Sequence, residues 1–423
     1  MKEGYKKTEL GVIPDEWEIK TAGDIFEFTG GLSISREKLG EEGVNYLHYG
    51  DIHKRNENFI DLDIDEQWLP KFNKEYENIK EGAKLETGDV VFADASEDYE
   101  GIGKSVAILN YDNKPFVAGL HTIVGKEKCN LLDEHYKRFC FSTTNIRKQF
   151  RSLATGSSVY GIKMSSLKRI KILTPPLKEQ QKIAQILSTV DSQIDDTDKL
   201  IEKTKELKKG LMQRLLTKGI GHKEFKKTEV GEIPVEWEVI RLGEIVNIKS
   251  GNSPSKFNFY DDGKYPFFKV DDMNYSTKYL SIGKLYYNES NFDLMNRGMI
   301  IFPKRGASIF TNKILILDSD GFFDTNLMGL ICNEKVNNEF LYYFLSYYEL
   351  SKIADTSSIP QINNKHIEPL IISLPEMKEQ KQIANILSSV DSQIEEYQNK
   401  KTKLEELKKG LMQQLLTGKV RVV

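Results

Sequence analysis

The chain repeats itself, and this duplication constrains the fold more than any other feature of its 423 residues. Residues 6–18 read KKTELGVIPDEWE and residues 226–238 read KKTEVGEIPVEWE, with ten identities in thirteen positions at an offset of 220. Residues 178–217 and 378–417 match without a gap at 25 of 40 positions, at an offset of 200. Self-similarity at a fixed spacing is typical of a repeated structural unit. We therefore expect two tandem copies of about 200 residues, related by a pseudo-twofold axis.

The segments between these matched flanks have diverged. Gly88 in ETGDVVF pairs with Gly298 in NRGMIIF at an offset of 210, whereas TGSSVYGI, from Thr155, pairs with DTSSIPQI, from Asp355, at 200. Matched flanks around diverged inserts favour one shared scaffolding task and two different recognition tasks. Neutral drift in the loops of a duplicated domain is the alternative.

A heptad stripe marks the matched flanks. Apolar residues recur on steps of four and three at Ile183, Leu187, Val190 and Ile194, and again at Ile383, Leu387, Val390 and Ile394. This spacing predicts two long coiled-coil helices, and prolines 175, 176 and 375 lie just upstream, where a helix can begin. The helices are expected to pair as an antiparallel coiled coil; the alternative is that each packs only on its own domain.

The inserts read as mixed α/β domains, so the predicted fold class is α+β. Short strands are expected at 89–92, 105–109, 116–124, 299–302 and 313–317, and helical turns near 134–142 and 339–348. The predicted division is an N-terminal segment 1–20, a first insert 21–176, a central helix 177–220, a linker 221–240 that repeats the N-terminal segment, a second insert 241–376 and a C-terminal helix 377–423. Loops carried by a rigid scaffold are where recognition usually lies.

The charge is close to balanced overall but not locally. There are 60 basic and 63 acidic side chains, a net charge of -3, and a pI near 6.2, which argues against a uniformly basic nucleic-acid binder. Residues 51–100, however, carry 6 basic and 15 acidic side chains, whereas 101–176 carry 13 basic and 4 acidic. The second block predicts a phosphate-facing surface with Lys104, Arg147, Lys148, Arg151, Lys163, Lys168, Arg169 and Lys171. A solvated helix and its flanks would be the alternative.

No complete catalytic or metal-binding set is visible. PDEWEIK at 14–20 contains the acids and lysine of many nucleases, but its duplicate PVEWEVI loses the Asp and the Lys, so Trp17 and Trp237 are expected to anchor a core instead. GIGKS at 101–105 lacks the first glycine of a phosphate-binding loop, and the six histidines have no ligand spacing. Three cysteines and no apolar leader or membrane span lead us to expect a cytoplasmic protein.

The repeated segments resemble a known family. PPLKEQQKIAQILSTVDSQI with LKKGLMQRLLT, its second copy LPEMKEQKQIANILSSVDSQI with LKKGLMQQLLT, and the opening KKTExGxIPxEWE closely resemble the specificity subunit of type I restriction-modification systems. The resemblance spans almost the whole chain, and the two inserts fall where that family has its target-recognition domains.

The resemblance implies a non-catalytic subunit. Each recognition domain would read one half of a gapped, asymmetric site in double-stranded DNA. The helices would bind two methyltransferase subunits and, in the full complex, the restriction and motor subunits, for adenine N6 methylation or ATP-dependent cleavage. The chain itself would hold no cofactor, because S-adenosylmethionine, ATP and Mg would be bound by those partners. No membrane partner is expected.

Polar, basic and aromatic residues in the inserts are the candidates for DNA contact. In the first domain they are Tyr46, His48, Tyr49, Lys54, Arg55, Lys104, Ser157, Ser158, Tyr160 and Lys163. In the second they are Ser253, Ser255, Lys256, Lys269, Lys304, Arg305, Ser357, Ser358, Gln361 and Asn363. Two other classes stay open at this point: a self-contained DNA methyltransferase or nuclease, and a coiled-coil interaction protein without a role on DNA.

Overall fold

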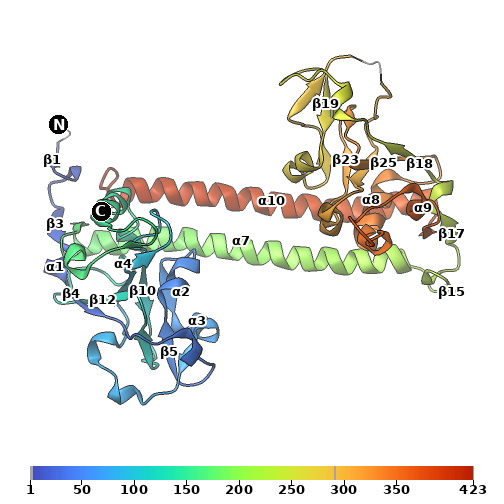
Figure 1. Ribbon diagram of the computed structural model, residues 1–423. Helices are drawn as coiled ribbons and strands as arrows, with labels where there is room; N and C mark the ends of the chain where they lie inside the picture. The colour runs from blue at the N-terminus through green and yellow to red at the C-terminus, as the bar shows by residue number, and fades with distance from the viewer. Residues whose placement is uncertain (1–2, 290–291, 423) are drawn as a thin grey trace. The chain divides into compact units, whose positions relative to one another are not determined.

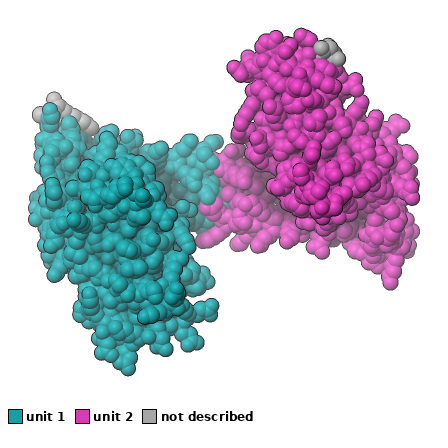
Figure 2. Space-filling model, in the orientation of Figure 1, with its two compact units in different colours: residues 1–197, 400–423 teal, residues 198–399 magenta. Residues whose placement is uncertain are grey.

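The computed structural model describes residues 3–289 and 292–422 (Figure 1). The chain forms two compact units: unit 1 comprises residues 1–197 and 400–423, and unit 2 comprises residues 198–399 (Figure 2). Two long helices, α7 (Leu177–Lys218) and α10 (Met377–Leu415), are shared, because each contributes one end to unit 1 and the other to unit 2. Each unit is therefore one insert together with one end of both helices.

Unit 1 is built on two sheets. The five-stranded sheet has the order β4 (Phe26–Gly30), β12 (Thr122–Glu127), β8 (Val90–Ala93), β10 (Ser105–Leu109) and β6 (Phe59–Asp61), and the three-stranded sheet has the order β11 (Phe116–Ala118), β5 (Val44–Leu47) and β7 (Lys71–Phe72). Pairing is antiparallel except between β10 and β6 and between β11 and β5. Every residue of β8 and β10 is buried, as expected of continuous apolar runs covered on both faces.

Short elements complete unit 1. The helices are α1 (Ala22–Ile25), α2 (Tyr49–Lys54), α3 (Leu62–Asp65), α4 (Lys137–Cys140), α5 (Thr144–Leu153) and α6 (Met164–Leu167). Three further strand pairs are β1 (Tyr5–Thr8) with β2 (Gly11–Pro14), β3 (Glu18–Thr21) with β14 (Lys171–Thr174), and β9 (Ala95–Ser96) with β13 (Tyr160–Gly161).

Unit 2 repeats the strand order of both sheets, and the β9–β13 pair is reduced there to an isolated bridge between Arg305 and Gln361. Its five-stranded sheet has the order β18 (Val246–Ser250), β25 (Leu327–Cys332), β22 (Ile300–Pro303), β23 (Leu315–Leu317) and β20 (Tyr279–Leu280), and its three-stranded sheet has the order β24 (Phe322–Phe323), β19 (Tyr265–Phe268) and β21 (Leu285–Tyr287). The further strand pairs are β15 (Phe225–Thr228) with β16 (Gly231–Pro234) and β17 (Glu238–Arg241) with β26 (Ile371–Leu374), and the short α-helices are α8 (Asn338–Tyr348) and α9 (Asn364–Ile367). The parallel pairs, β23 with β20 and β19 with β24, are also the equivalent ones. The duplication inferred from the flanks therefore extends through the diverged inserts.

One predicted strand is wrong. The apolar run at 116–124 is not one strand but two, β11 and β12, which belong to different sheets. The chain turns between them, and His121 adopts a φ of +56°, which a strand cannot accommodate. Periodicity could not reveal this turn, because the run on both sides of it is equally apolar.

The long helices run antiparallel within each unit. In unit 1, Ile183 and Leu187 near the start of α7 share a core with Leu415 and Leu416 at the end of α10. In unit 2 the roles are exchanged: Ile383 and Leu387 of α10 share a core with Leu215 and Leu216 of α7. Val190 and Val390 are also buried, whereas Ile194 and Ile394 are half-buried. The predicted antiparallel pairing of the helices is confirmed, and each pair also packs against its own insert.

No helix within residues 3–289 and 292–422 is both long enough and apolar enough to cross a bilayer.

Candidate nucleic-acid interface

Three segments far apart in sequence meet at one edge of unit 1. They are the end of β8 at Asp94, the turn before β12 at His121, and the loop that leads to Ile162. The amide of Asp94 donates to the carbonyl of His121 at 3.1 Å, and the amide of Ile162 donates to the carbonyl of Asp94 at 2.8 Å. Both hydrogen bonds join main-chain groups, so they do not depend on which side chains are present. We call the backbone that they hold together the frame of a polar face.

Unit 2 has the same frame with different side chains. The amide of Lys304, after β22, donates to the carbonyl of Asn326 at 2.8 Å, and the amide of Ile362 donates to the carbonyl of Lys304 at 2.8 Å. Lys304 therefore stands where Asp94 stands in unit 1, and Asn326 stands where His121 stands. An acid is replaced by a base at one position, and an imidazole by an amide at the other.

A helical turn after the central strand of the three-stranded sheet adds a further equivalent pair. His48 follows β5 and Lys269 follows β19, and the amide of each donates to a carboxylate three residues on, to Asp51 at 3.2 Å and to Asp272 at 2.8 Å. His48 Nδ1 accepts a hydrogen bond from the amide of Gly50 at 3.0 Å. Burial lowers the pKa of His48, so the neutral ring that can accept this bond is favoured.

Aromatic rings and imidazoles cluster on the face of unit 1. The ring of Tyr49 lies 4.5 Å from His48, 5.3 Å from His121 and 6.0 Å from His53, measured between ring centroids. His53 Nε2 donates to the carbonyl of Ala95 at 2.9 Å. Unit 2 has a basic and hydroxylic face at the equivalent place, where Lys304 Nζ donates to Ser250 Oγ at 3.2 Å.

The loops that carry the candidate serines have the same backbone hydrogen bonds in both units. The amides of Thr155 and Gly161 donate to each other's carbonyls at 2.9 and 2.7 Å, and those of Asp355 and Gln361 do so at 2.9 and 3.0 Å. The paired serines at the loop tips, Ser157 and Ser158 in unit 1 and Ser357 and Ser358 in unit 2, are all exposed. Tyr160 packs on Tyr99, with 5.1 Å between ring centroids, whereas its counterpart is Pro360.

Several candidates in the first domain are engaged inward. Tyr46 is fully buried, and its hydroxyl donates to the carbonyl of Leu32 and accepts from the amide of Leu120, both at 2.7 Å. Arg55 donates to Asp65 at 3.0 Å, and Lys104 Nζ donates to the carbonyls of His53 and Arg55. Tyr46 and Lys104 therefore hold the loops in place, and Tyr46 is left out of the face.

Part of the basic block, residues 101–176, is also engaged in contacts within the unit. Arg147 donates to the carbonyls of Glu100 and Ile102, Arg151 pairs with the Glu100 carboxylate, and Lys171 pairs with Glu9. Of the eight basic residues predicted to face phosphates, four are exposed: Lys148, Lys163, Lys168 and Arg169. Lys54, outside this block, is also exposed.

The candidates in unit 2 are more open. Arg305, Lys256, Ser255 and Asn363 are exposed, whereas Ser253 and Lys269 are half-buried. Ser253 and Ser255 share a hydrogen bond of 2.8 Å, and Lys269 Nζ lies 5.8 Å from the centroid of the Phe259 ring. Three residues of the two faces, Asp94, His121 and Asn326, were missed by sequence reasoning. Only a turn signal inside the apolar runs, such as GLH at 119–121 or DTN at 324–326, could have found them.

A duplicated latch ties each repeated hairpin segment to a helix start. Trp17 Nε1 donates to Glu179 at 2.8 Å in unit 1, and Trp237 Nε1 donates to Glu379 at 3.0 Å in unit 2. Both indoles are buried, so the prediction that they anchor a core is confirmed. The basic residue that completes the latch differs: Arg421 donates to Glu179 at 2.7 Å, whereas His222 lies 2.9 Å from Glu379.

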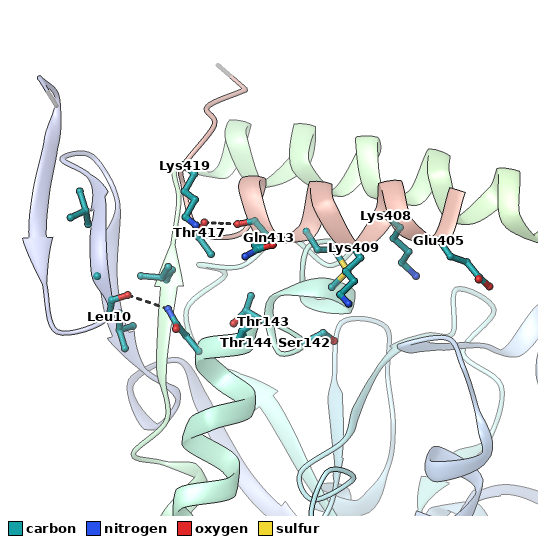
Figure 3. A pocket seen from close by; sticks show the side chains of 15 residues that line it. Leu10, Ser142, Thr143, Thr144, Glu405, Lys408, Lys409, Gln413, Thr417 and Lys419 are labelled. Atoms are coloured by element: carbon teal, nitrogen blue, oxygen red, sulfur yellow. Dashed lines mark hydrogen bonds between the residues drawn. The ribbon is translucent and has the colours of Figure 1, made fainter. Parts of the chain in front are cut away.

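A groove lies beside each latch. In unit 1 it has a volume of about 710 Å³ and is lined by the β1–β2 turn, the residues before and at the start of α5 and the last turns of α10 (Figure 3). Lys409, Gln413 and Lys419 line one side, and Leu10 and Thr144 the other. In unit 2 a groove of about 500 Å³ is lined by the β15–β16 turn and the ends of α7 and α8. Both grooves are built partly from repeated segments.

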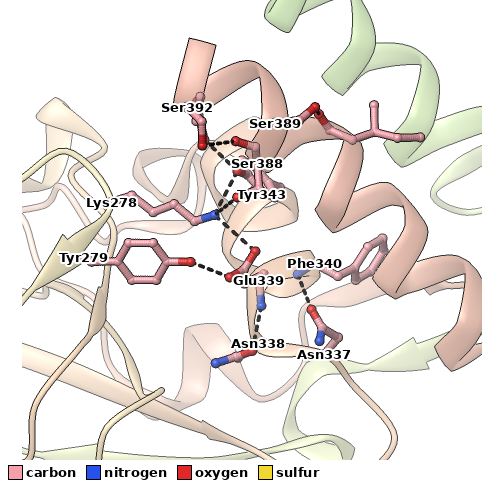
Figure 4. Close-up of polar contacts among 12 residues, drawn as sticks. Lys278, Tyr279, Asn337, Asn338, Glu339, Phe340, Tyr343, Ser388, Ser389 and Ser392 are labelled. Atoms are coloured by element: carbon pink, nitrogen blue, oxygen red, sulfur yellow. Dashed lines mark hydrogen bonds and ion pairs between the residues drawn. The ribbon is translucent and has the colours of Figure 1, made fainter. Parts of the chain in front are cut away.

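A buried cation joins each insert to the helices. In unit 2, Lys278 Nζ contacts Tyr343 Oη at 3.0 Å, Ser388 Oγ at 3.1 Å and Glu339 at 3.2 Å (Figure 4). In unit 1 the equivalent serine and aspartate, Ser188 and Asp191, face a guanidinium instead: Arg138 lies 3.4 Å from Ser188 Oγ and 3.9 Å from Asp191. Within the described residues, no group of three or more His, Cys, Asp or Glu side chains is arranged to hold a metal ion.

Comparisons with known proteins agree on one family. The model described as type I restriction modification DNA specificity domain matches residues 14–206 and 234–406. The MjaX specificity subunit of Methanocaldococcus jannaschii is 32% identical, over 99% of this chain and 97% of that protein, and the MjaVIII specificity subunit of the same organism is 28% identical, over 99% and 96%. The crystal structure of a type I restriction-modification S subunit from M. genitalium has a similar fold, with a TM-score of 0.57, 18% identity and coverage of 94% of this chain and 96% of that one.

Proposed function

The chain belongs to the family of DNA specificity subunits of type I restriction-modification systems, and from this premise we propose that each unit reads one half of a two-part DNA site. A specificity subunit supplies sequence recognition and has no catalysis of its own. The proposal concerns how recognition is divided between the units and which residues carry it.

The observation that supports this division is one backbone frame with two different sets of side chains. Equivalent positions hold His48 and Lys269, Asp94 and Lys304, and His121 and Asn326. Identical faces would read identical half-sites, whereas faces that differ in charge and in hydrogen-bonding groups read different ones. The proposed site is therefore asymmetric, with unread base pairs between its halves.

Two kinds of contact would divide the work on each half-site. Exposed lysines and arginines, such as Lys54, Lys163 and Arg305, are suited to phosphates, which give affinity and a strong dependence on salt. The serines at the loop tips and the polar side chains of the frame are suited to base edges, which give selectivity.

The partners are proposed from the repeated segments. We infer that the two grooves beside the latches dock two methyltransferase subunits, one on each unit, because the helix end and hairpin turn that line them come from the matched parts of the duplication. Restriction and motor subunits would join in the full complex, and S-adenosylmethionine, ATP and Mg would be bound by these partners. The proposed modification is N6 methylation of adenine.

A binding selection tests the division of labour. The full chain, assembled with its methyltransferase subunits, is mixed with randomised DNA duplexes, and the retained sequences are determined. We expect two short blocks of preferred bases separated by a gap of fixed length. Replacing residues 241–375 by another recognition domain should change one block only, with the wild-type chain as the matched control. A single uninterrupted block, or a change in both blocks, would contradict the proposal.

A second experiment addresses the enzyme alternative. Purified chain alone, incubated with DNA and either S-adenosylmethionine or Mg, should neither methylate nor cleave it. Turnover by the chain alone would show that it is a self-contained enzyme.

A further inference from the structure

His121 has a backbone conformation that requires an explanation. Its φ of +56° lies in the left-handed region, which residues with a side chain rarely adopt unless the surroundings impose it. Two backbone hydrogen bonds flank this position: the carbonyl of His121 accepts from Asp94, and the neighbouring carbonyl of Leu120 accepts from Tyr49 at 3.3 Å. The first has a counterpart in unit 2, from Lys304 to Asn326, but Asn326 does not have a positive φ. Strained positions of this kind cluster at functional sites, which prompts the question of what the side chain does.

The imidazole of His121 is held on two sides. Its Nδ1 lies 3.1 Å from Asp94 Oδ1, and because a carboxylate only accepts, Nδ1 carries the proton. The ring also packs edge-to-face against Tyr49, at an interplanar angle of 81°. Among the described residues, no group hydrogen-bonds to Nε2 on the opposite side of the ring, and 51% of the side chain is exposed. An oriented ring with one unused acceptor is therefore presented to the outside.

The equivalent residue of unit 2 is oriented by a different carboxylate. Asn326 occupies the same backbone position, directly before β25, as His121 does before β12. Its amide nitrogen Nδ2 donates to Asp324 Oδ2 at 3.4 Å, and its backbone amide donates to Asp324 Oδ1 at 2.7 Å. Each unit thus offers one exposed hydrogen-bonding side chain at this turn, held by an aspartate, but with a different donor and acceptor pattern.

We propose that His121 and Asn326 are matched base-reading residues, one for each half-site, and that Asp94 is the positioning residue of His121. This inference rests on the proposed function and names the residues that execute it. In the neutral ring with its proton on Nδ1, His121 Nε2 accepts a hydrogen bond, so the partner of this form is an exocyclic amino group in the major groove, N6 of adenine or N4 of cytosine. Asn326 retains an acceptor and a donor, the pair that matches adenine N6 and N7.

The test is the binding selection on randomised duplexes, carried out with the full chain and its methyltransferase subunits. We expect H121A to lose about tenfold or more of its preference at one base pair of one block, with the other block unchanged. N326A should do the same at one base pair of the other block. H135A is the matched control, because His135 is a half-buried histidine of the same unit that lies 3.5 Å from Glu134 and outside the face. This control should keep both blocks.

Two further variants separate reading from folding. H121G removes the imidazole but tolerates a positive φ, so it should fold and show the same loss at the same base pair as H121A. D94N keeps the shape of the positioning residue but removes its charge, and it should weaken the preference at that one base pair without lowering affinity for non-specific DNA. If the role of Asp94 is merely structural, D94N should lower both the preference at that base pair and the affinity for non-specific DNA.

The failures are distinguishable. If H121G folds and keeps its preference at every base pair, His121 does not read bases and this inference is wrong. If the wild-type chain itself selects no two-block sequence, it is the proposed function that fails.

Discussion

In unit 1 the residue that follows β8 is Asp94 and the turn before β12 carries His121, whereas in unit 2 the same positions hold Lys304 and Asn326. The backbone hydrogen bonds that join these positions are the same in both units, to within 0.3 Å in the one that links strand end to turn. The order of the strands in the sheets and the positions of the parallel strand pairs also agree between the units. The comparison teaches that the frame is held by main-chain groups, which do not depend on side chains, so recognition can diverge at a few positions without altering the fold.

The helical side of each unit shows the opposite balance. There the side chains are retained, as in the Trp17–Glu179 and Trp237–Glu379 latches, and only the basic residue beside the glutamate differs. Arg421 and His222 each arrive just after the end of the neighbouring long helix. The side chains of the latches are therefore retained between the units, whereas those of the faces that are proposed to read DNA are not.

The largest expected effect tests whether the two latches are equivalent. W17A and W237A each remove a fully buried indole and should lower the free energy of unfolding of their own unit by about 3 to 5 kcal/mol. Urea denaturation followed by hydrogen exchange in each unit measures this. If one substitution is far milder than the other, the latches are not equivalent.

The next effect should separate the two basic residues of the latches, Arg421 and His222. R421A leaves the carboxylate of Glu179, which is 2% exposed, with only the Trp17 indole, and should cost unit 1 about 3 kcal/mol. H222A should cost less, because Glu379 is 15% exposed and keeps the Trp237 indole and the amide of Ile220. Thermal unfolding of the two variants, each beside the wild type, gives the comparison. Equal losses would mean that burial of the glutamate does not set the cost.

A smaller loss is expected at the buried cation of unit 2. K278A removes the hydrogen bonds of Nζ to Tyr343 and Ser388 and its pairing with Glu339, and should cost about 2 kcal/mol. K335A, an exposed lysine of the same unit, is the control and should be nearly neutral. Because Arg138 performs this task in unit 1, the loss should be confined to unit 2, as hydrogen exchange can establish. Loosening of unit 1 as well would contradict this separation.

The smallest effect depends on pH and should appear in one unit only. Burial lowers the pKa of His48 below its value in the unfolded chain, about 6.5, so its neutral form stabilises unit 1 above that pH. This stability should be lost as the pH falls from about 6.5 through the folded-state pKa, because protonation removes the acceptor that binds the amide of Gly50. Unit 2 has Lys269 at this position, so its stability should not fall in the same way over this pH range.

Unfolding between pH 7.5 and 5, with H48N as the control, measures this difference. Asparagine can still accept the hydrogen bond from the amide of Gly50 but does not titrate, so the loss of stability at low pH should vanish in H48N. If the loss of stability persists in H48N, it comes from another titrating group.

Much of the fold could be predicted from the residues. The heptad stripe through Ile183 and Leu187 is a local pattern, and it gave the helices and their packing. The buried tryptophans followed from their duplication. The residues of the polar face were harder to predict, because Tyr46 and Lys104 are of the types that contact DNA but are used within the fold. No local signal in the sequence distinguishes a lysine that donates to two carbonyls from one that is free.

The sequence by itself determined the duplication, the two helices and the absence of a complete catalytic motif, because repeats, heptads and motif spacings are properties of the chain read in order. Only the tertiary structure decided which residues meet at the two faces. Asp94 and His121 are 27 positions apart and come together because β8 and β12 pair, and because a turn within an apolar run reverses the chain between β11 and β12. Such meetings depend on strand pairing across the sheet, which one-dimensional periodicity does not encode.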